Sequence, residues 1–129
     1  MIKAFGTEGS IKTEFTNGKI TCSSDTTPDK GGKGEGFRPH ELLEAALANC
    51  MNMALRMLAA QNAIRLSSVE TTVCLNRNAP EEVCFEYSVA FPKELAEPDR
   101  QRLMEAVNSC PVRETLLKTI SFREKRENP

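Results

Sequence analysis

Residues 36–62, GFRPHELLEAALANCMNMALRMLAAQN, form the longest helical pattern in the sequence and constrain its fold most strongly. Between residues 41 and 61 there is no glycine, proline or β-branched residue, and good helix formers dominate. Pro39 suits a first helical turn, because its missing N–H would have no partner there. We therefore expect one helix of roughly 22 residues, about 33 Å long, which is close to the width of a small domain.

Apolar side chains recur along this segment at helical spacing, and a cysteine lies among them. We expect the apolar stripe to comprise Leu43, Ala46, Leu47, Cys50, Ala54, Met57 and Leu58. Other apolar residues, including Met51 and Leu55, fall on further faces of the helix. Such a helix needs more cover than one small sheet provides, and a second copy of the chain is the simplest source of it.

Short strands and two shorter helices are expected around this helix. Strand patterns occur at residues 2–5, 10–15, 19–23, 69–75, 83–91 and 119–122, and helical patterns at 99–109 and 111–118. Asn17-Gly18 between two of the strand patterns is a strong hairpin signal. This order predicts an α+β fold, with an antiparallel sheet and helices gathered on one face. A length of 129 residues predicts a single domain over residues 1–129.

Composition argues against several classes of partner. The net charge of −1 gives no reason to expect nucleic acid or a membrane surface as partner. The N-terminus has no apolar run, so we expect no signal peptide or anchor and a cytoplasmic location. Five cysteines, an odd number, indicate reduced thiols rather than a disulfide framework. With one histidine and no Cys-x-x-Cys pair, we expect neither a metal site nor a cofactor.

Two of the cysteines are candidates for chemistry. Cys110 directly precedes Pro111, at the start of a short helical pattern. The positive end of the helix dipole and the nearby cation of Arg113 are expected to lower the pKa of the Cys110 thiol. Cys50 has apolar neighbours on its helix, so a core role is the alternative unless another segment supplies a cation.

The other three cysteines are expected to be structural. We expect the inward face of the first hairpin to hold Ile11, Phe15, Ile20 and Cys22. Cys74 and Cys84 fall on the opposite parity from the apolar faces of their strand patterns, and are interpreted as structural or incidental. Residues 24–36 are rich in Gly, Asp, Thr and Pro, which indicates either a flexible connection or a mobile rim over a site at the helix start.

Two segments together resemble the OsmC/Ohr family, which comprises osmotically inducible protein C and organic hydroperoxide resistance proteins. RPHELL at residues 38–43, AALA at 45–48 and Cys50 resemble the central-helix motif of that family. CPVRETL at residues 110–116 is similar to its second motif. The two motifs stand in the family's order and at a similar separation, so the resemblance covers nearly the whole chain.

The resemblance implies a single OsmC-like domain in an intertwined homodimer, with a long central helix carrying Cys50. It implies a thiol-dependent peroxide reductase that acts on organic hydroperoxides. Cys50 would be the peroxidatic thiolate and Cys110 the resolving thiol. An external dithiol would then reduce the Cys50–Cys110 disulfide, so that no cofactor is needed.

The chain departs from the family pattern at two positions. Active members usually have a glutamate directly after the proline of the first motif; here that position is His40, and Glu41 follows. They also use an arginine from the N-terminal strands to stabilise the thiolate, a role that would fall here to Lys12 or Arg38. Two alternatives therefore stay open: a non-catalytic dimer that binds a small apolar ligand, and a slow redox sensor.

Overall fold

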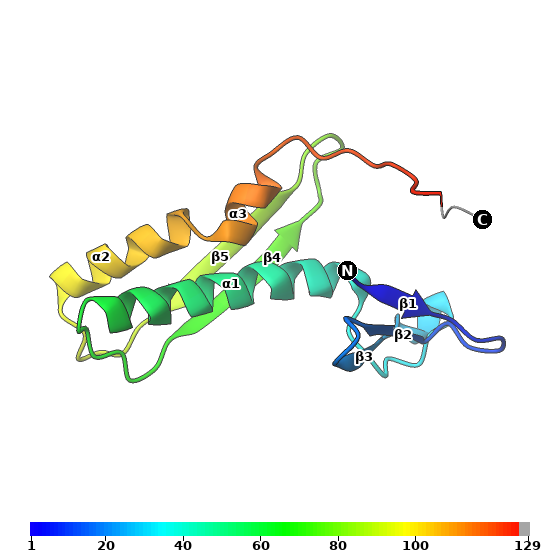
Figure 1. Cartoon of the computed structure of the whole chain (residues 1–129), viewed down its shortest axis with the longest axis horizontal. Helices are drawn as coiled ribbons and strands as arrows, with labels where there is room; N and C mark the ends of the chain where they lie inside the picture. The colour runs from blue at the N-terminus through cyan, green and yellow to red at the C-terminus, as the bar shows by residue number, and fades with distance from the viewer. Residues whose placement is uncertain (127–129) are drawn as a thin grey trace. The chain divides into compact units, whose positions relative to one another are not determined.

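A computed structural model of the chain describes residues 1–126 and has an α+β fold (Figure 1). The elements are, in order, β1 Lys3–Phe5, β2 Thr13–Thr16, β3 Thr21–Ser24, the 3-10 helix η1 Pro28–Lys30, α1 Pro39–Gln61, β4 Glu70–Asn76, β5 Cys84–Ala90, α2 Glu97–Asn108 and α3 Pro111–Leu116. The expected fold class, with antiparallel strand pairs and one long helix, is confirmed. Two compact units make up the chain, so a single domain stays a prediction. The first unit holds Met1–Ala46 with Val73–Glu86, and the second holds Leu47–Thr72 with the chain from Tyr87 onward.

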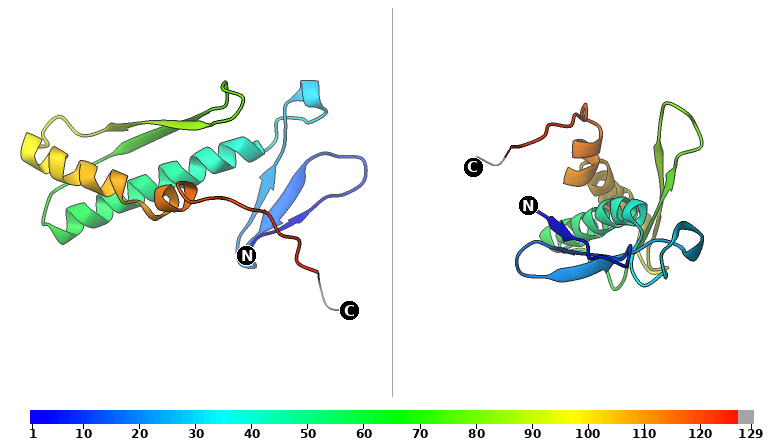
Figure 2. Two further views of the ribbon diagram at one scale, coloured as in Figure 1. Left: turned by 90° about the horizontal axis from the view of Figure 1, so that it is seen from above. Right: turned by 90° about the vertical axis from the view of Figure 1, so that its right-hand side faces the viewer.

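The first unit contains an antiparallel sheet in the order β1-β2-β3 (Figure 2). In this sheet Phe15 pairs with Ala4 on one side and with Cys22 on the other. The expected hairpin at Asn17-Gly18 is confirmed. The Asn17 side-chain oxygen accepts the N–H groups of Lys19 and Ile20, each at 2.9 Å, and Gly18 takes a φ of 98°. Such a φ suits glycine because no Cβ opposes it.

The sequence predicts that one face of this sheet is apolar and buried. For a single copy of the chain, this prediction is wrong. Ile11, Ile20 and Cys22 are exposed, and only Phe15 is half-buried. Among the described residues of the first unit, no hydrophobic side chain is buried. The physical reason is that no second apolar layer of this unit covers the sheet.

The loop between β3 and α1 is organised by one buried carboxylate. Asp25 is only 4% exposed, and its carboxylate accepts the N–H groups of Thr26 at 2.8 Å and of Lys33 and Glu35 at 3.1 Å. These hydrogen bonds, that of Glu35 foremost, hold the pKa of Asp25 below its usual value. Gly32 is required, since a Cβ there would lie 2.1 Å from the carbonyl oxygen of Thr26. The loop is therefore internally bonded rather than a plain linker.

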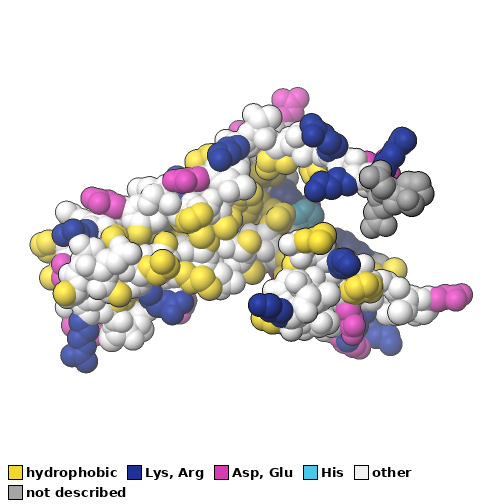
Figure 3. All heavy atoms as spheres, viewed as in Figure 1, with side chains coloured by type: hydrophobic (Ala, Val, Ile, Leu, Met, Phe, Trp, Pro, Cys, Tyr) yellow, Lys and Arg dark blue, Asp and Glu magenta, His cyan; other side chains and the backbone are white. Residues whose placement is uncertain are grey.

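The long helix α1 matches its expected bounds closely, but it buries a different face from the one predicted. Its buried residues lie four apart: Leu47, Met51, Leu55 and Ala59. Leu43 and Met57 of the predicted stripe are 46% and 61% exposed. Figure 3 shows hydrophobic side chains gathered on the surface over α1 and α2. The error arises because α1 is apolar on several faces, so that its packing partners decide which face is buried.

The core of the second unit joins α1 to α2, which runs alongside the later part of α1 (Figures 1 and 2). Among residues 1–126, five large side chains are completely buried: Met51, Leu55, Leu103, Val107 and Cys110. On α2, Leu103 and Val107 therefore belong to this core. Because these residues are large and fully buried, they supply most of the hydrophobic stabilisation of this unit.

A polar network attaches α1 to β4 within the second unit. The Asn52 amide donates hydrogen bonds to the carbonyl oxygen of Val69 at 3.2 Å and to the Thr71 hydroxyl at 3.3 Å. The Thr71 hydroxyl in turn donates to the carbonyl oxygen of Ala48 at 2.9 Å, and Arg56 donates to the Asn52 oxygen at 2.9 Å. The network therefore gives Asn52, a polar residue in the middle of α1, its hydrogen-bond partners.

The C-terminal segment differs from its prediction. Residues 119–122, expected to form a last strand, pair with no strand in the part of the chain that the structure describes, and Phe122 is 97% exposed. A strand needs a neighbouring edge to satisfy its backbone groups, and the β1-β2-β3 and β4-β5 sheets accept none here. Residues 127–129 lie outside the described residues. Within residues 1–126, no helix has both the length and the apolar character that crossing a membrane requires.

Candidate active site

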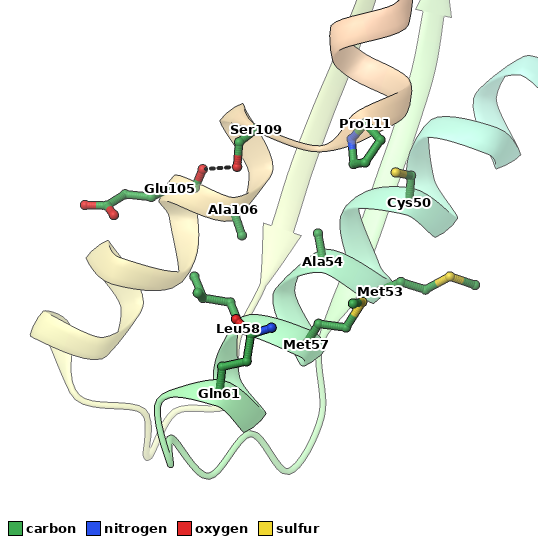
Figure 4. A pocket seen from close by; sticks show the side chains of 10 residues that line it. All are labelled: Cys50, Met53, Ala54, Met57, Leu58, Gln61, Glu105, Ala106, Ser109 and Pro111. Atoms are coloured by element: carbon green, nitrogen blue, oxygen red, sulfur yellow. Dashed lines mark hydrogen bonds between the residues drawn. The ribbon is translucent and has the colours of Figure 1, made fainter.

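Cys50 lies at the middle of α1 and opens onto a pocket in the second unit (Figure 4). The pocket has a volume of about 520 Å³. Its lining residues are Cys50, Met53, Ala54, Met57, Leu58, Gln61, Glu105, Ala106, Ser109 and Pro111. The six residues from α1 repeat at helical spacing, so one face of the helix forms a whole wall of the pocket.

Most of this lining is apolar, and none of the lining residues is basic. Two methionines, Met53 and Met57, supply flexible thioethers that adapt to irregular shapes. On the α2 side, the Ser109 hydroxyl donates to the backbone carbonyl of Glu105 at 3.3 Å (Figure 4). The pocket therefore offers an alkyl group a continuous apolar wall beside the Cys50 thiol.

Cys110 lies at the N-cap of α3 and is fully buried. The prediction of a lowered pKa is wrong: burial raises the pKa of the Cys110 thiol above its ordinary value. The N–H groups of Arg113 and Val112 act in the opposite direction, as expected at a helix start, but they do not outweigh burial. The neighbouring Cys50 also acts to raise the pKa of Cys110.

The structure thus brings together the two cysteines that the sequence singled out. Cys50 lines the pocket together with Ser109 and Pro111, the residues on either side of Cys110, so the two cysteines lie close to each other (Figure 4). Both belong to the second unit, although 60 positions separate 50 from 110 in the sequence. An arrangement of two adjacent reduced thiols beside an apolar pocket can form a disulfide and can be reduced again.

Arg113, the cation expected to act on Cys110, has another partner. Its guanidinium carbon lies 5.8 Å from the centroid of the Tyr87 ring, which is the geometry of a cation–π contact. The Arg113 cation therefore contacts the face of the Tyr87 ring. Burial is the largest influence on the pKa of Cys110 and raises it.

Four further residues are candidate supports for the reactive thiolate: Lys12, Arg38, His40 and Glu41. All four belong to the first unit. Lys12 forms an ion pair with Glu35 at 3.3 Å. Arg38 donates to Glu41; this hydrogen bond raises the pKa of Arg38 and lowers the pKa of the Glu41 carboxyl. His40 is exposed in the first turn of α1. Lys12, Arg38 and Glu41 therefore have partners within their own unit.

The remaining cysteines, Cys22, Cys74 and Cys84, are all exposed. The prediction that Cys22 is a core residue is thus wrong within the chain, while the outward parity of Cys74 and Cys84 is confirmed. Across residues 1–126, no three His, Cys, Asp or Glu side chains gather in a group that could hold a metal ion.

Sequence reasoning missed part of the pocket. Met53 and Gln61 could have been predicted from their spacing to Cys50, because each lies close to a whole number of helical turns from it along α1. Nothing comparable in the sequence indicated Glu105, Ala106 and Ser109, because only tertiary packing brings α2 beside α1.

Comparisons with known proteins agree with this architecture. The family model described as OsmC-like protein matches residues 32–125. An osmotic stress induced and detoxification response protein from Psychrobacter arcticus is 24% identical, with a TM-score of 0.70 over 88% of this chain and 85% of that chain. An OsmC-like protein from Mycoplasma pneumoniae is 21% identical, with a TM-score of 0.69 over 90% and 85% of the two chains.

A third solved structure is the organic hydroperoxide resistance protein OsmC of Legionella pneumophila. It is 22% identical, with a TM-score of 0.64 over 91% of this chain and 88% of that chain. No curated protein sequence matches the chain. At these identities the solved structures show a shared fold, and the family model matches well over half of the sequence. The chain therefore belongs to the family of OsmC-like proteins.

Proposed function

We propose that the protein is a thiol-dependent peroxide reductase that reduces organic hydroperoxides. The observation that carries the proposal is the closeness of Cys50 to Cys110, since Cys50 lines an apolar pocket together with Ser109 and Pro111, which flank Cys110 in the sequence. The Legionella protein of the same fold is named for organic hydroperoxide resistance, which supports this choice of substrate class.

In the first step, the Cys50 thiolate attacks the terminal oxygen of the hydroperoxide. A sulfur–oxygen bond forms, the O–O bond breaks, and the alkoxide leaves as an alcohol after taking a proton. Cys50 becomes a sulfenic acid, so that the sulfur has lost the two electrons that the peroxide has gained. The apolar lining of Met53, Ala54 and Met57 suits the alkyl part of such a substrate.

In the second step, Cys110 attacks the sulfenic sulfur of Cys50. A disulfide forms, and the hydroxide leaves as water with the proton from Cys110. The raised pKa of Cys110 supports this order, since Cys110 stays protonated while the Cys50 thiol is reduced. An external dithiol then reduces the disulfide by exchange, which requires a reducing compartment such as the cytoplasm.

We further propose an intertwined homodimer as the working form. The first unit exposes large apolar side chains, including Ile2, Phe5, Ile11, Ile20 and Phe37, and buries none among its described residues. An isolated small sheet of this kind is marginally stable in water. A second copy of the chain would cover both these residues and the exposed apolar side of α1.

Cysteine variants test the proposed reaction. Cys50→Ser is expected to abolish consumption of cumene hydroperoxide in the presence of a dithiol, while the fold is retained. Cys110→Ser is expected to consume one equivalent and to accumulate a sulfenic acid on Cys50 that dimedone traps. Cys74→Ser, which removes an exposed thiol, is the matched control and should turn over as the wild type does. Turnover at the wild-type rate in Cys50→Ser would overturn the proposal.

A second candidate function is the binding of a small apolar ligand without turnover. The observation that favours it is the adaptable wall of Met53 and Met57, together with a lining in which no residue is basic. Retention of an apolar ligand by wild type and Cys50→Ser alike, with no peroxide consumed by either, would establish this function in place of the reductase.

A further inference from the structure

Two aromatic side chains of the second unit each contact an arginine from a different helix. The Arg100 guanidinium of α2 lies over the Phe91 ring, with 5.4 Å between its central carbon and the ring centroid. The Arg113 guanidinium of α3 lies over the Tyr87 ring, at 5.8 Å. Tyr87 belongs to β5 and Phe91 directly follows that strand, so one short segment of the chain contacts both helices.

The two helices depend on these contacts to different degrees. α2 buries Leu103, Ala106 and Val107, so the hydrophobic core fixes its position. α3 has only six residues and buries none of them. A helix this short is not stable by itself and needs contacts with the rest of the protein. The contact between Arg113 and Tyr87 is such an attachment, and α3 has no buried side chain of its own to replace it.

Cys110 is bonded directly to α3 and turns with it. It is the N-cap of this helix, and its carbonyl oxygen accepts the N–H of Glu114 at 3.1 Å. On its N-terminal side, the chain is held in the core by Val107 of α2. On its C-terminal side, the nearest anchored side chain is Arg113, three positions later. The direction of the buried Cys110 thiol is therefore controlled from that side by the contact with Tyr87.

The two steps of the proposed reaction differ in their need for this orientation. Cys110 takes no part in the attack of the Cys50 thiolate on the peroxide. In the second step, the Cys110 sulfur must approach the sulfenic sulfur of Cys50 from the side opposite the departing hydroxide. A disulfide tolerates only a narrow range of distances and dihedral angles, and a misplacement of about 1 Å is enough to slow such a step.

We propose that Tyr87 is a positioning residue for disulfide formation: through Arg113, its ring holds α3 in the orientation from which the Cys110 sulfur attacks that of Cys50. The assignment rests on the proposed reductase function, because it concerns the second step of that reaction. It gives the cation–π contact of α3 a role that the corresponding contact of α2 does not have.

Competition between Cys110 and dimedone for the sulfenic acid of Cys50 tests the assignment. The ratio of dimedone adduct to disulfide depends on the second step alone. Tyr87→Leu is expected to raise this ratio about threefold to fivefold and to leave the rate of the first step unchanged. Arg113→Met should have the same effect. Tyr87→Phe keeps the aromatic face and should behave as the wild type, and Phe91→Leu, which removes the contact of α2, is the matched control.

A second measurement needs no peroxide. In a Cys50→Ser background, alkylation of Cys110 by iodoacetamide is followed across pH by peptide mass spectrometry, with the exposed Cys74 as internal standard. Tyr87→Leu should loosen α3 and admit water to Cys110. Alkylation should then be several-fold faster, and the midpoint of its pH profile should move down toward that of an ordinary thiol. Tyr87→Phe should restore the slow alkylation and the higher midpoint.

The outcomes separate the two proposals. If the wild type consumes peroxide but Tyr87→Leu changes neither measurement, or if Tyr87→Phe is as impaired as Tyr87→Leu, the positioning role is overturned and the reductase stands. If the wild type consumes no peroxide but alkylation of Cys110 responds to Tyr87→Leu and recovers in Tyr87→Phe, the reductase fails and the control of Cys110 by Tyr87 stands. If no peroxide is consumed and alkylation does not respond, both proposals are overturned.

Discussion

The guanidinium of Arg113 lies over the ring of Tyr87, with 5.8 Å between its central carbon and the ring centroid. We expect Arg113→Met and Tyr87→Leu to be coupled by about 0.5–1 kcal/mol in a double-mutant cycle, because each removes one half of the same cation–π contact. Urea denaturation measures the four free energies of unfolding. The pair Arg113→Met and Phe91→Leu is the control, since Phe91 contacts Arg100 instead and should show no coupling. Coupling of zero between Arg113 and Tyr87 would contradict the contact.

The raised pKa of Cys110 predicts a specific loss of stability at alkaline pH. Between the ordinary thiol pKa and the raised one, the unfolded chain has released a proton that the folded chain still holds. The contribution of Cys110 to stability is therefore fully present below the ordinary value and is lost as the pH rises through the raised value. Urea midpoints measured from about pH 7 to about pH 10 should fall less steeply in Cys110→Ala than in the wild type. Cys74→Ala should keep the wild-type slope, and identical slopes in all three proteins would refute the raised pKa.

The amide of Asn52 should contribute to stability through β4. Asn52→Ala removes the donor to Val69 and Thr71 and leaves both acceptors without it, at an expected cost of about 1–3 kcal/mol in the free energy of unfolding. Asn49→Ala changes an exposed residue of the same helix and should be neutral within about 0.5 kcal/mol. Chemical denaturation compares the two variants, and an equal cost for both would show that the network contributes nothing.

Asp25 should control the order of the loop between β3 and α1. Asp25→Ala removes the acceptor of three backbone N–H groups, so hydrogen exchange at Lys33 and Glu35 is expected to become several-fold faster. Since the pKa of Asp25 is lowered, its contribution is present above the ordinary carboxyl pKa and is lost as the pH falls through the lowered value. Asp29→Ala, an exposed change in the same loop, serves as control. Exchange rates that do not respond to Asp25→Ala would rule out the carboxylate as the organiser.

The sequence was sufficient where local preferences decide the structure. α1 could be predicted almost to the residue, because Pro39 fits its first turn and strong helix formers follow without interruption. The start of α3 followed from Pro111 in the same way. The pairing of the two cysteines was available only through the resemblance of two motifs to a family.

Where tertiary context decides, sequence reasoning failed. The buried face of α1 is set by Met51 and Leu55, and no periodicity distinguishes that face from the equally apolar one through Cys50. The pKa of Cys110 depends on burial among other segments, which outweighs the local helix start. Asp25 looked like an ordinary loop residue, since the N–H groups it accepts come from positions up to ten residues away.

The central claim, that Cys50 and Cys110 form one redox pair, is tested most directly by mapping thiols before and after one equivalent of an organic hydroperoxide. Mass spectrometry of the digested protein should show that both free thiols are lost together and appear in one cross-linked peptide, while Cys22, Cys74 and Cys84 stay free. Free Cys50 and Cys110 after long exposure would contradict the claim and would leave the protein with the fold of its family but without this chemistry.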